Sequence, residues 1–203
     1  MGLKNQVSEE LLTCPHSPLF KIKMSRLEQH YENTLMEELV ETFNYNDVSD
    51  LPSVDKIIIN CGLKSINFND KLIHPILLAL EGLTGQRPKI TRSAKDNSNL
   101  KIRSGMISGV KVTLRGTRMF MFLEQLVLTY LPRIDYFSGF SAKSISKEGN
   151  FSFRIENPQN VLFIESEFEK FQTLGPIDIT IVFKNSTYEE SLMLLNGLQV
   201  PVK

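Results

Sequence analysis

The sequence predicts an α+β protein with one mainly antiparallel sheet, helices packed on one face of that sheet, and long functional loops. Strand-like and helix-like segments both occur, but they do not follow the regular strand–helix alternation of a parallel sheet. The chain has 203 residues, of which 41% are hydrophobic, and this suffices for one sizeable core but is short for two. We therefore expect one domain over residues 26–203, after a loose N-terminal extension, residues 1–25, that lacks hydrophobic periodicity.

Four segments carry the apolar repeat of an amphipathic helix. They lie at about residues 26–43, 70–82 and 117–131, and from about residue 187 onward. Capping signals precede three of them: Ser25 with Glu28, Thr117 alone, and either Ser186 with Glu189 or Thr187 with Glu190. Gly82 and Gly85 are expected to end the second helix and Pro132 the third, because glycine favours a helix C-terminus and proline cannot continue a helix.

Five runs are typical of strands: residues 54–60, 110–115, 151–155, 161–164 and 177–183. The second run alternates most clearly, with apolar side chains on one side and Lys111, Thr113 and Arg115 on the other. Side chains on one side of a strand are about 7 Å apart, twice the ~3.3 Å rise per residue. Such a row suits the successive phosphates of a nucleic-acid strand. The alternative is a solvated strand face, but solvated faces usually mix both signs of charge.

Two loops stand out. Residues 93–99 contain no large apolar side chain and are rich in Ser, Asn and Asp, so we expect an exposed loop there. Residues 135–150 form a Ser-, Gly- and Lys-rich stretch that is long for a compact domain. We therefore expect this second loop to be functional or mobile.

Charge is concentrated in the middle of the chain, although the whole chain has a net charge of zero. Residues 87–118 contain nine basic residues and one acid, Asp96, which gives this segment a net charge of +8. Such a cationic centre between acidic flanks predicts binding to a polyanion, most often nucleic acid. The segment contains no aromatic residue, so base stacking is not expected within it. Contacts to phosphate and sugar, and recognition of a folded RNA by its shape, are expected instead.

Several function classes find no support in the sequence. The phosphate-loop-like Gly105-x-x-x-Gly109-x-Lys111 lacks the Gly-Lys-Ser/Thr ending, and no catalytic motif or carboxylate pair is present, so we expect no enzyme. Cys14 and Cys61 form neither a disulfide framework nor a metal-ligand pattern, so we expect no metal and no cofactor. No apolar run is long enough to span a membrane. We also expect no small-molecule substrate.

Three basic-region motifs resemble the bacterial-type ribosomal protein L5 family: Gly85-Gln-Arg-Pro-Lys-Ile-Thr91, Lys101-Ile-Arg-Ser-Gly105 and Gly109-Val-Lys-Val-Thr-Leu-Arg-Gly116-x-Arg-Met119. Further matches follow in the family's order at residues 43–46, 59–62, 132–134, 140–144, 149–150 and 175–181, so the resemblance covers about residues 26–203. It implies a structural protein of the large ribosomal subunit that binds 5S rRNA in the central protuberance. It also implies contacts with large-subunit rRNA, peptidyl-site tRNA, neighbouring proteins of the central protuberance and a small-subunit head protein.

The resemblance also assigns residues to these partners. The implied rRNA contacts are Asn60, Gly62, Gln86, Arg87, Lys89, Lys111, Thr113, Arg115 and Arg118. The implied tRNA-facing loop, residues 91–103, carries Arg92, Lys95, Lys101 and Arg103. The implied intersubunit bridge, residues 132–150, carries Arg133, Lys143 and Lys147.

The chain departs from the family pattern at identifiable positions. Cys61 stands where Met is usual, Ala94 replaces a usual base and Asn99 a usual Gly, and the last two changes weaken the implied tRNA contact. This drift favours an organellar ribosome, with the mitochondrion first and the plastid second. Two alternatives stay open at this stage. One is a ribosomal scaffold that meets proteins or large rRNA in a ribosome without 5S rRNA, and the other is an RNA-acting enzyme.

Overall fold

One open antiparallel sheet organises the chain. The structure is a computed structural model, and it describes residues 25–43, 45, 47, 50–62, 73–96, 98–99, 103–134, 137–156, 158 and 175–203. The strands are β1 (Ser53–Gly62), β2 (Lys89–Arg92), β3 (Ile107–Leu114), β4 (Phe151–Ile155) and β5 (Ile177–Lys184). They are ordered β2-β3-β1-β5-β4, and every neighbouring pair is antiparallel. This confirms the predicted α+β class. The predicted extension and the predicted strand at 161–164 lie outside the described residues.

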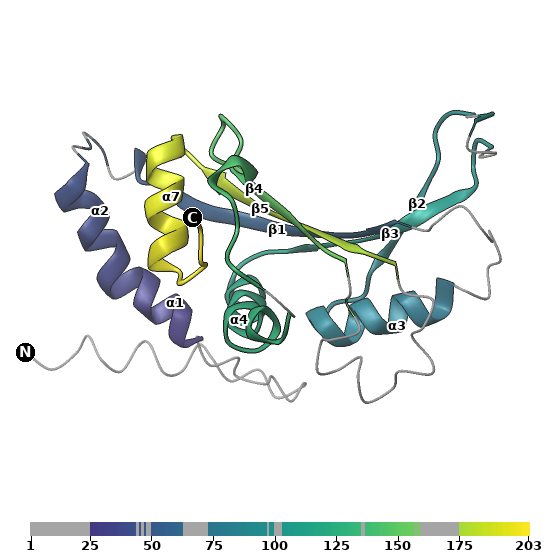
Figure 1. Ribbon diagram of the computed structural model, residues 1–203, viewed down its shortest axis with the longest axis horizontal. Helices are drawn as coiled ribbons and strands as arrows, with labels where there is room; N and C mark the ends of the chain where they lie inside the picture. The colour runs from purple at the N-terminus through teal and green to yellow at the C-terminus, as the bar shows by residue number, and fades with distance from the viewer. Residues whose placement is uncertain are drawn as a thin grey trace, which may run out of the picture.

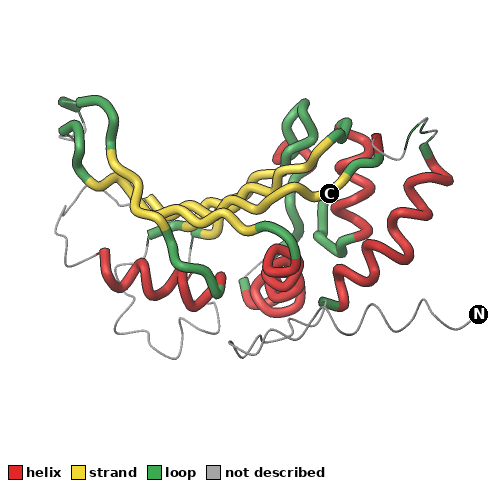
Figure 2. Tube along the Cα trace, turned by 180° about the vertical axis from the view of Figure 1, so that it is seen from behind, coloured by secondary structure: helices red, strands yellow, loops and turns green. Residues whose placement is uncertain are grey.

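The longer helices lie beneath this sheet or at one end of it (Figure 1). The helices are α1 (Arg26–His30), η2 (Tyr31–Leu35), α2 (Met36–Thr42), α3 (Ile73–Thr84), α4 (Thr117–Gln125), η5 (Leu126–Tyr130), η6 (Leu131–Arg133), η7 (Ala142–Ser144) and α7 (Tyr188–Gly197). Figure 1 shows α3 and α4 beneath the sheet, with α1, α2 and α7 grouped at one end of it. The same arrangement is seen from behind in Figure 2. None of the helices in the described part of the chain is long and apolar enough to cross a membrane.

Side-chain capping explains where two helices begin. At the first helix, Glu28 N donates to Ser25 Oγ at 3.1 Å, and Ser25 N donates to the Glu28 carboxylate, as predicted. Of the two possible boxes before α7, the structure has Thr187 with Glu190. The predicted cap at Thr117 is wrong, because Gly116 occupies that position and the Thr117 hydroxyl donates to Glu28 Oε1 instead. Thr117 thereby joins α4 to α1.

Three predicted boundaries also shift. Helix α3 continues past Gly82 to Thr84 and ends at Gly85, the second of the two glycines predicted to end it, whose φ of +63° suits glycine. Pro132 does not end its helix, since it lies inside the 3-10 turn Leu131–Arg133 that extends it. Strand β3 begins at Ile107 and ends at Leu114, so Arg115 lies just beyond the strand.

The core lies between the sheet and the helices. Every second residue along the central parts of β1, β3, β4 and β5 is buried, including Ile59, Val112, Phe151 and Ile181. The intervening residues are mostly half-buried or exposed, and Figure 1 shows α3 and α4 on the opposite side of the sheet. The sheet therefore has one apolar face beneath the helices and one open face.

Candidate nucleic-acid interface

The strand register assembles the open face into rows of side chains. In one row, Lys89 of β2 lies opposite Lys111 of β3, which lies opposite Asn60 of β1. The row continues through Asp178 of β5 to Arg154 of β4. A neighbouring row runs through Thr113, Ile58, Thr180 and Ser152. We call the part over β2, β3 and β1 the cationic half and the part over β5 and β4 the paired half.

Two like charges face each other in the cationic half. Lys89 and Lys111 are directly opposed and exposed, and directly opposed residues on antiparallel strands have Cβ atoms about 4.5–5.5 Å apart. Like charges in this arrangement destabilise a sheet. Neither ammonium group forms an ion pair with any residue that the structure describes. The arrangement is therefore explained most simply by an anion that binds between or above the two lysines.

The rest of the cationic half is flat and polar. Gly62 lies opposite Gly109, so the surface beside Lys111 has two positions without a side chain. A Cβ built on Gly109 would lie 2.6 Å from the backbone oxygen of Cys61, so only glycine fits there without a shift of the strand. Gln86 Nε2 donates to the Thr113 backbone oxygen at 3.2 Å, which holds the predicted contact Gln86 beside β3. A ligand can approach the backbone closely at Gly62, where no side chain intervenes.

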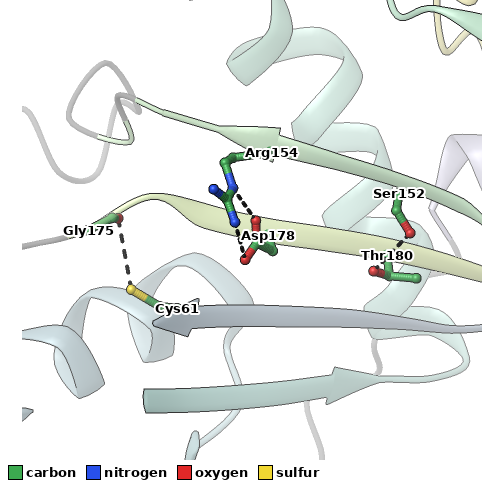
Figure 3. Close-up of polar contacts among 6 residues, drawn as sticks. All are labelled: Cys61, Ser152, Arg154, Gly175, Asp178 and Thr180. Atoms are coloured by element: carbon green, nitrogen blue, oxygen red, sulfur yellow. Dashed lines mark hydrogen bonds and ion pairs between the residues drawn. The ribbon is translucent and has the colours of Figure 1, made fainter. Parts of the chain in front are cut away.

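The paired half neutralises its own charge (Figure 3). Arg154 donates to both oxygens of Asp178, at 2.6 and 3.2 Å, and Ser152 donates to Thr180 at 3.2 Å. The hydrogen bonds from Arg154 to Asp178 raise the pKa of the Arg154 guanidinium. No sequence motif pointed to this pair, because the two residues lie on different strands whose register only the fold determines.

Arg115 differs from the two lysines. Its Nη1 contacts Asp55 Oδ1 at 2.5 Å, and Lys56 contacts the other oxygen of that carboxylate at 3.3 Å. Desolvation alone would raise the pKa of Asp55, but hydrogen bonds from Lys56 and Arg115 outweigh it and lower the pKa. The predicted row of Lys111, Thr113 and Arg115 therefore contains one cation, Arg115, that already has a carboxylate partner.

Two predicted rRNA contacts lie away from these rows. Arg87 is exposed and lines a groove between α3 and β2, and Arg118 is exposed on the first turn of α4 beside the C-terminal end of α3. Both belong to the basic segment, but the structure does not bring them onto the open face. Asn60, Gly62, Lys89, Lys111 and Thr113 are brought together there.

The hairpin between β2 and β3 rises above the open face at one end of the sheet (Figure 1). Its base continues the strand pairing, since Ser93 N donates to Met106 O and Gly105 N to Ser93 O. Asp96, the one acid of the basic segment, accepts from Ser104 N and so stabilises the hairpin. Of the predicted tRNA-facing cations, Arg92, Lys95 and Arg103 are exposed, and Lys101 lies outside the described residues.

The described part of the predicted bridge is anchored to the C-terminal end of the chain. Phe140 N donates to Pro201 O at 2.8 Å, and Lys203 N donates to Phe140 O at 2.7 Å. Arg133, Lys143 and Lys147 are exposed on this segment. The segment is thus held by backbone hydrogen bonds, which its polar sequence did not reveal.

The described residues offer no metal site. These residues contain no group of His, Cys, Asp or Glu side chains that could hold a metal ion. Cys61 is buried in the core, and burial raises the pKa of its thiol to about 11. Cys61 is therefore a core residue, while Cys14 lies outside the described residues. The geometry supports binding to an extended anionic surface.

Comparison with known proteins gives the same family along most of the chain. Residues 48–103 match the family described as "Ribosomal protein L5", and residues 107–202 match the model of the C-terminus of that ribosomal protein family. The chain is similar to "Large ribosomal subunit protein uL5m" of Reclinomonas americana, with 40% identity over 179 residues covering 88% of this chain and 98% of that protein. It is also similar to "Large ribosomal subunit protein uL5" of Oceanobacillus iheyensis, with 36% identity over 178 residues and the same coverage.

Proposed function

Since the chain belongs to the ribosomal protein L5 family, as a non-enzymatic structural constituent of the large ribosomal subunit in translation, we propose that it binds 5S rRNA in the central protuberance. The RNA would lie on the cationic half of the open face. The observation that carries this proposal is the directly opposed pair of exposed lysines, Lys89 and Lys111, which has no acid partner among the described residues. An RNA phosphate would relieve the repulsion between them.

Within this proposal the residues have different tasks. Lys89 and Lys111 contact phosphate, Asn60 and Thr113 offer hydrogen bonds to sugar or phosphate, and Gly62 admits the RNA backbone. Gln86 positions the edge of the RNA beside β3. Arg87, Arg115 and Arg118 contribute long-range attraction, since they lie around the open face or already have a partner.

The two raised ends of the open face have further proposed partners. The β2–β3 hairpin, with Arg92, Lys95, Lys101 and Arg103, would face peptidyl-site tRNA. The segment around residues 132–150, with Arg133, Lys143 and Lys147, would face a protein of the small-subunit head. Exposed cations at both ends support these proposals. Large-subunit rRNA and neighbouring proteins of the central protuberance would cover the remaining surface.

The ribosome is proposed to be organellar, with the mitochondrion first and the plastid second. The relative named uL5m and the departures at Cys61, Ala94 and Asn99 support this. Residues 26–203 are proposed to act as one domain. In support, central β1 pairs on one side with β3 and on the other with β5.

Binding of the full chain to 5S rRNA tests the main proposal. In a titration with 5S rRNA at several salt concentrations, the logarithm of the affinity should fall with the logarithm of salt by about 0.7–0.9 per phosphate neutralised. An unrelated folded RNA of similar length, tested in parallel, should bind more weakly because it presents a different shape. Equal binding of both RNAs at every salt concentration would contradict specific recognition of 5S rRNA.

One alternative keeps the chain in the ribosome but removes 5S rRNA. In that case the cationic half would meet large-subunit rRNA or an acidic protein, because some organellar ribosomes lack 5S rRNA. Sequencing the RNA that co-purifies with the chain in large subunits distinguishes the two. Recovery of large-subunit rRNA alone, from a ribosome in which 5S rRNA is present, would contradict the 5S assignment.

A further inference from the structure

A second surface lies on the helix side of the sheet, at its β2 edge. A groove of about 710 Å³ separates α3 from β2 and the start of β3. Its apolar lining is contributed by Ile73, Leu77, Leu78, Ile90, Met106 and Ile107. The volume falls within the range of sites that bind a ligand of drug-like size. Lys89, Lys111 and Asn60 of the open face do not line this groove, whereas Arg87 and Arg92 do.

Two apolar side chains that line this groove remain exposed among the described residues. Leu78 of α3 is 48% exposed and Ile90 of β2 is 37% exposed, although both are large apolar side chains. They face one groove from two different elements. Exposed apolar surface that is gathered in a groove and surrounded by polar residues marks an interaction site more often than isolated apolar residues do.

The groove lies along a sheet edge that can accept another strand. β2 is the terminal strand of the sheet order, and among the strands that the structure describes it pairs with β3 alone. An edge strand leaves backbone N–H and C=O groups directed away from the sheet, and an extended peptide can pair with them. Because side chains alternate along a strand, alternate residues of such a peptide would enter the groove beside Ile90. The others would lie beside Lys89 on the open face.

Charge selects the kind of peptide. Arg87 and Arg92 line the groove, and Lys89 lies on the opposite side of the same strand, whereas Glu81 is the acid among the lining residues that the structure describes. A peptide with apolar residues toward the groove and acidic residues toward Lys89 complements both sides of β2. RNA has phosphates for the cations but no apolar side chains to fill the space between Leu78 and Ile90.

We propose that the α3–β2 groove is a docking site for an extended segment of a partner protein that pairs with β2 and alternates apolar and acidic residues. The segment would bind as a sixth strand. Its apolar side chains would pack between Leu78 and Ile90, and its carboxylates would neutralise Lys89 and reach Arg87 or Arg92 at the ends of the groove. Backbone pairing would give affinity, and the alternation would give specificity.

A fluorescent peptide of alternating valine and glutamate is the probe, and the full chain is the protein. Fluorescence anisotropy should show binding of this peptide, and hydrogen exchange should show slower exchange of the β2 amides in its presence. A peptide of the same composition with the valines and glutamates in separate blocks should bind at least about tenfold more weakly. An alternating valine–lysine peptide should bind more weakly still, because Arg87, Lys89 and Arg92 would repel it.

Variants locate the site. Leu78→Glu and Ile90→Glu should each weaken binding of the alternating valine–glutamate peptide by about tenfold or more, because each places a carboxylate against the apolar residues. Leu128→Glu is the matched control, since Leu128 is 64% exposed and does not line the groove, and it should leave binding unchanged. Glu81→Gln should strengthen binding by about two- to threefold, because it removes the acid of the groove lining.

Three results would overturn the proposal. Failure of the alternating valine–glutamate peptide to bind the unmodified chain is the first. Equal binding of the block peptide is the second, since it would show attraction by charge alone. The third is binding of the alternating valine–glutamate peptide that Leu78→Glu and Ile90→Glu leave unchanged, which would place the peptide outside the groove. Both ligands would use Lys89, but the peptide is measured without RNA, and Leu78 and Ile90 lie off the open face. The peptide results therefore do not depend on whether 5S rRNA binds there.

Discussion

The two halves of the open face use similar residues in opposite ways. Both contain cations flanked by hydroxyl groups, yet Lys89 and Lys111 oppose each other without an acid partner among the described residues, while Arg154 is bound by Asp178. The cationic half thus keeps its charge for a ligand, and the paired half cancels its own. Counting basic residues does not separate the two cases. The strand register decides which cations have a carboxylate partner.

This difference also limits where an RNA can lie. Asp178 stands in the same row as Lys111, with only Asn60 between them. An RNA strand that follows the row from β2 toward β4 would first pass the two lysines. Beyond Asn60 of β1 its phosphates would meet the negatively charged carboxylate of Asp178 on β5. We expect the RNA footprint to end near β1.

The largest change in affinity for 5S rRNA should come from the double substitution Lys89→Ala with Lys111→Ala. Removal of two phosphate contacts should reduce the salt slope of 5S rRNA binding by about 2 and the affinity by roughly 10- to 100-fold. Stability should be unchanged or slightly higher, because a pair of opposed like charges is removed. Filter binding over a salt series measures the slope, and urea unfolding measures the stability.

The matched control is the double substitution Arg154→Ala with Asp178→Ala, which changes no net charge on the paired half. It should alter affinity by less than about twofold, since it removes an ion pair that binds no phosphate. If this variant lost as much affinity as the lysine variant, the distinction between the two halves would be wrong.

The second-largest change should be a gain of affinity for 5S rRNA in the variant Asp178→Asn. Asp178→Asn keeps the shape of the side chain but removes its charge, which releases Arg154 to bind phosphate. We expect the affinity for 5S rRNA to rise about three- to tenfold and the salt slope to increase by about 1. Affinity for unrelated RNA should rise by a similar factor, because a phosphate contact carries no sequence information. Unchanged affinity would mean that the RNA does not extend to β5.

A smaller loss is expected for Arg115→Ala. Arg115 lies just beyond β3 and contacts Asp55 at 2.5 Å, so part of its charge is already neutralised. Affinity should fall by about two- to threefold, clearly less than in the lysine variant. A loss equal to that of the lysine variant would show that Arg115 leaves Asp55 when RNA binds. The comparison requires both variants to be measured at one salt concentration.

The smallest expected effect concerns pH. Because the pKa of Asp55 is lower in the folded chain than in the unfolded chain, its contacts with Lys56 and Arg115 stabilise the fold above the ordinary carboxyl pKa. This contribution is lost as the pH falls through the lowered, folded-state pKa. Urea unfolding of the unmodified chain and of Asp55→Asn should therefore differ near neutral pH and converge in acid. A difference that grows in acid would have the wrong sign.

The sequence predicted which segments form helices and strands better than it predicted the residues at which they begin and end. Alternation at Val110, Val112 and Leu114 identified the central part of β3, because a half-buried strand must bury every second residue. Strand β2 was missed, since it has four residues and one large apolar side chain, Ile90. Thr117 matched a helix cap by residue type, but the Glu28 carboxylate accepts the hydrogen bond from its hydroxyl. Local chemistry alone could not reveal that tertiary partner.

The candidate site was predicted in part for the same reason. Lys111 and Thr113 were expected on one outward face from their spacing, and Asn60, Gly62 and Lys89 from a family resemblance. That Lys89, Lys111 and Asn60 form one row depends on the register of three strands. Arg115 seemed equivalent to Lys111 because spacing does not show that Asp55 lies beside it. Pairwise neutralisation across strands is visible only in the folded chain.

The strand order has a consequence for how the protein is made. Ile59 of central β1 pairs with Val112 on one side and with Ile179 on the other, so both of its neighbours are synthesised long after it. Contacts between residues so distant in sequence form slowly. While the chain is being synthesised, β1 has no partner strand until β3 has been made, and its second side stays unpaired until β5 has been made. RNA binding by the cationic half should therefore require the chain to be made at least through β3.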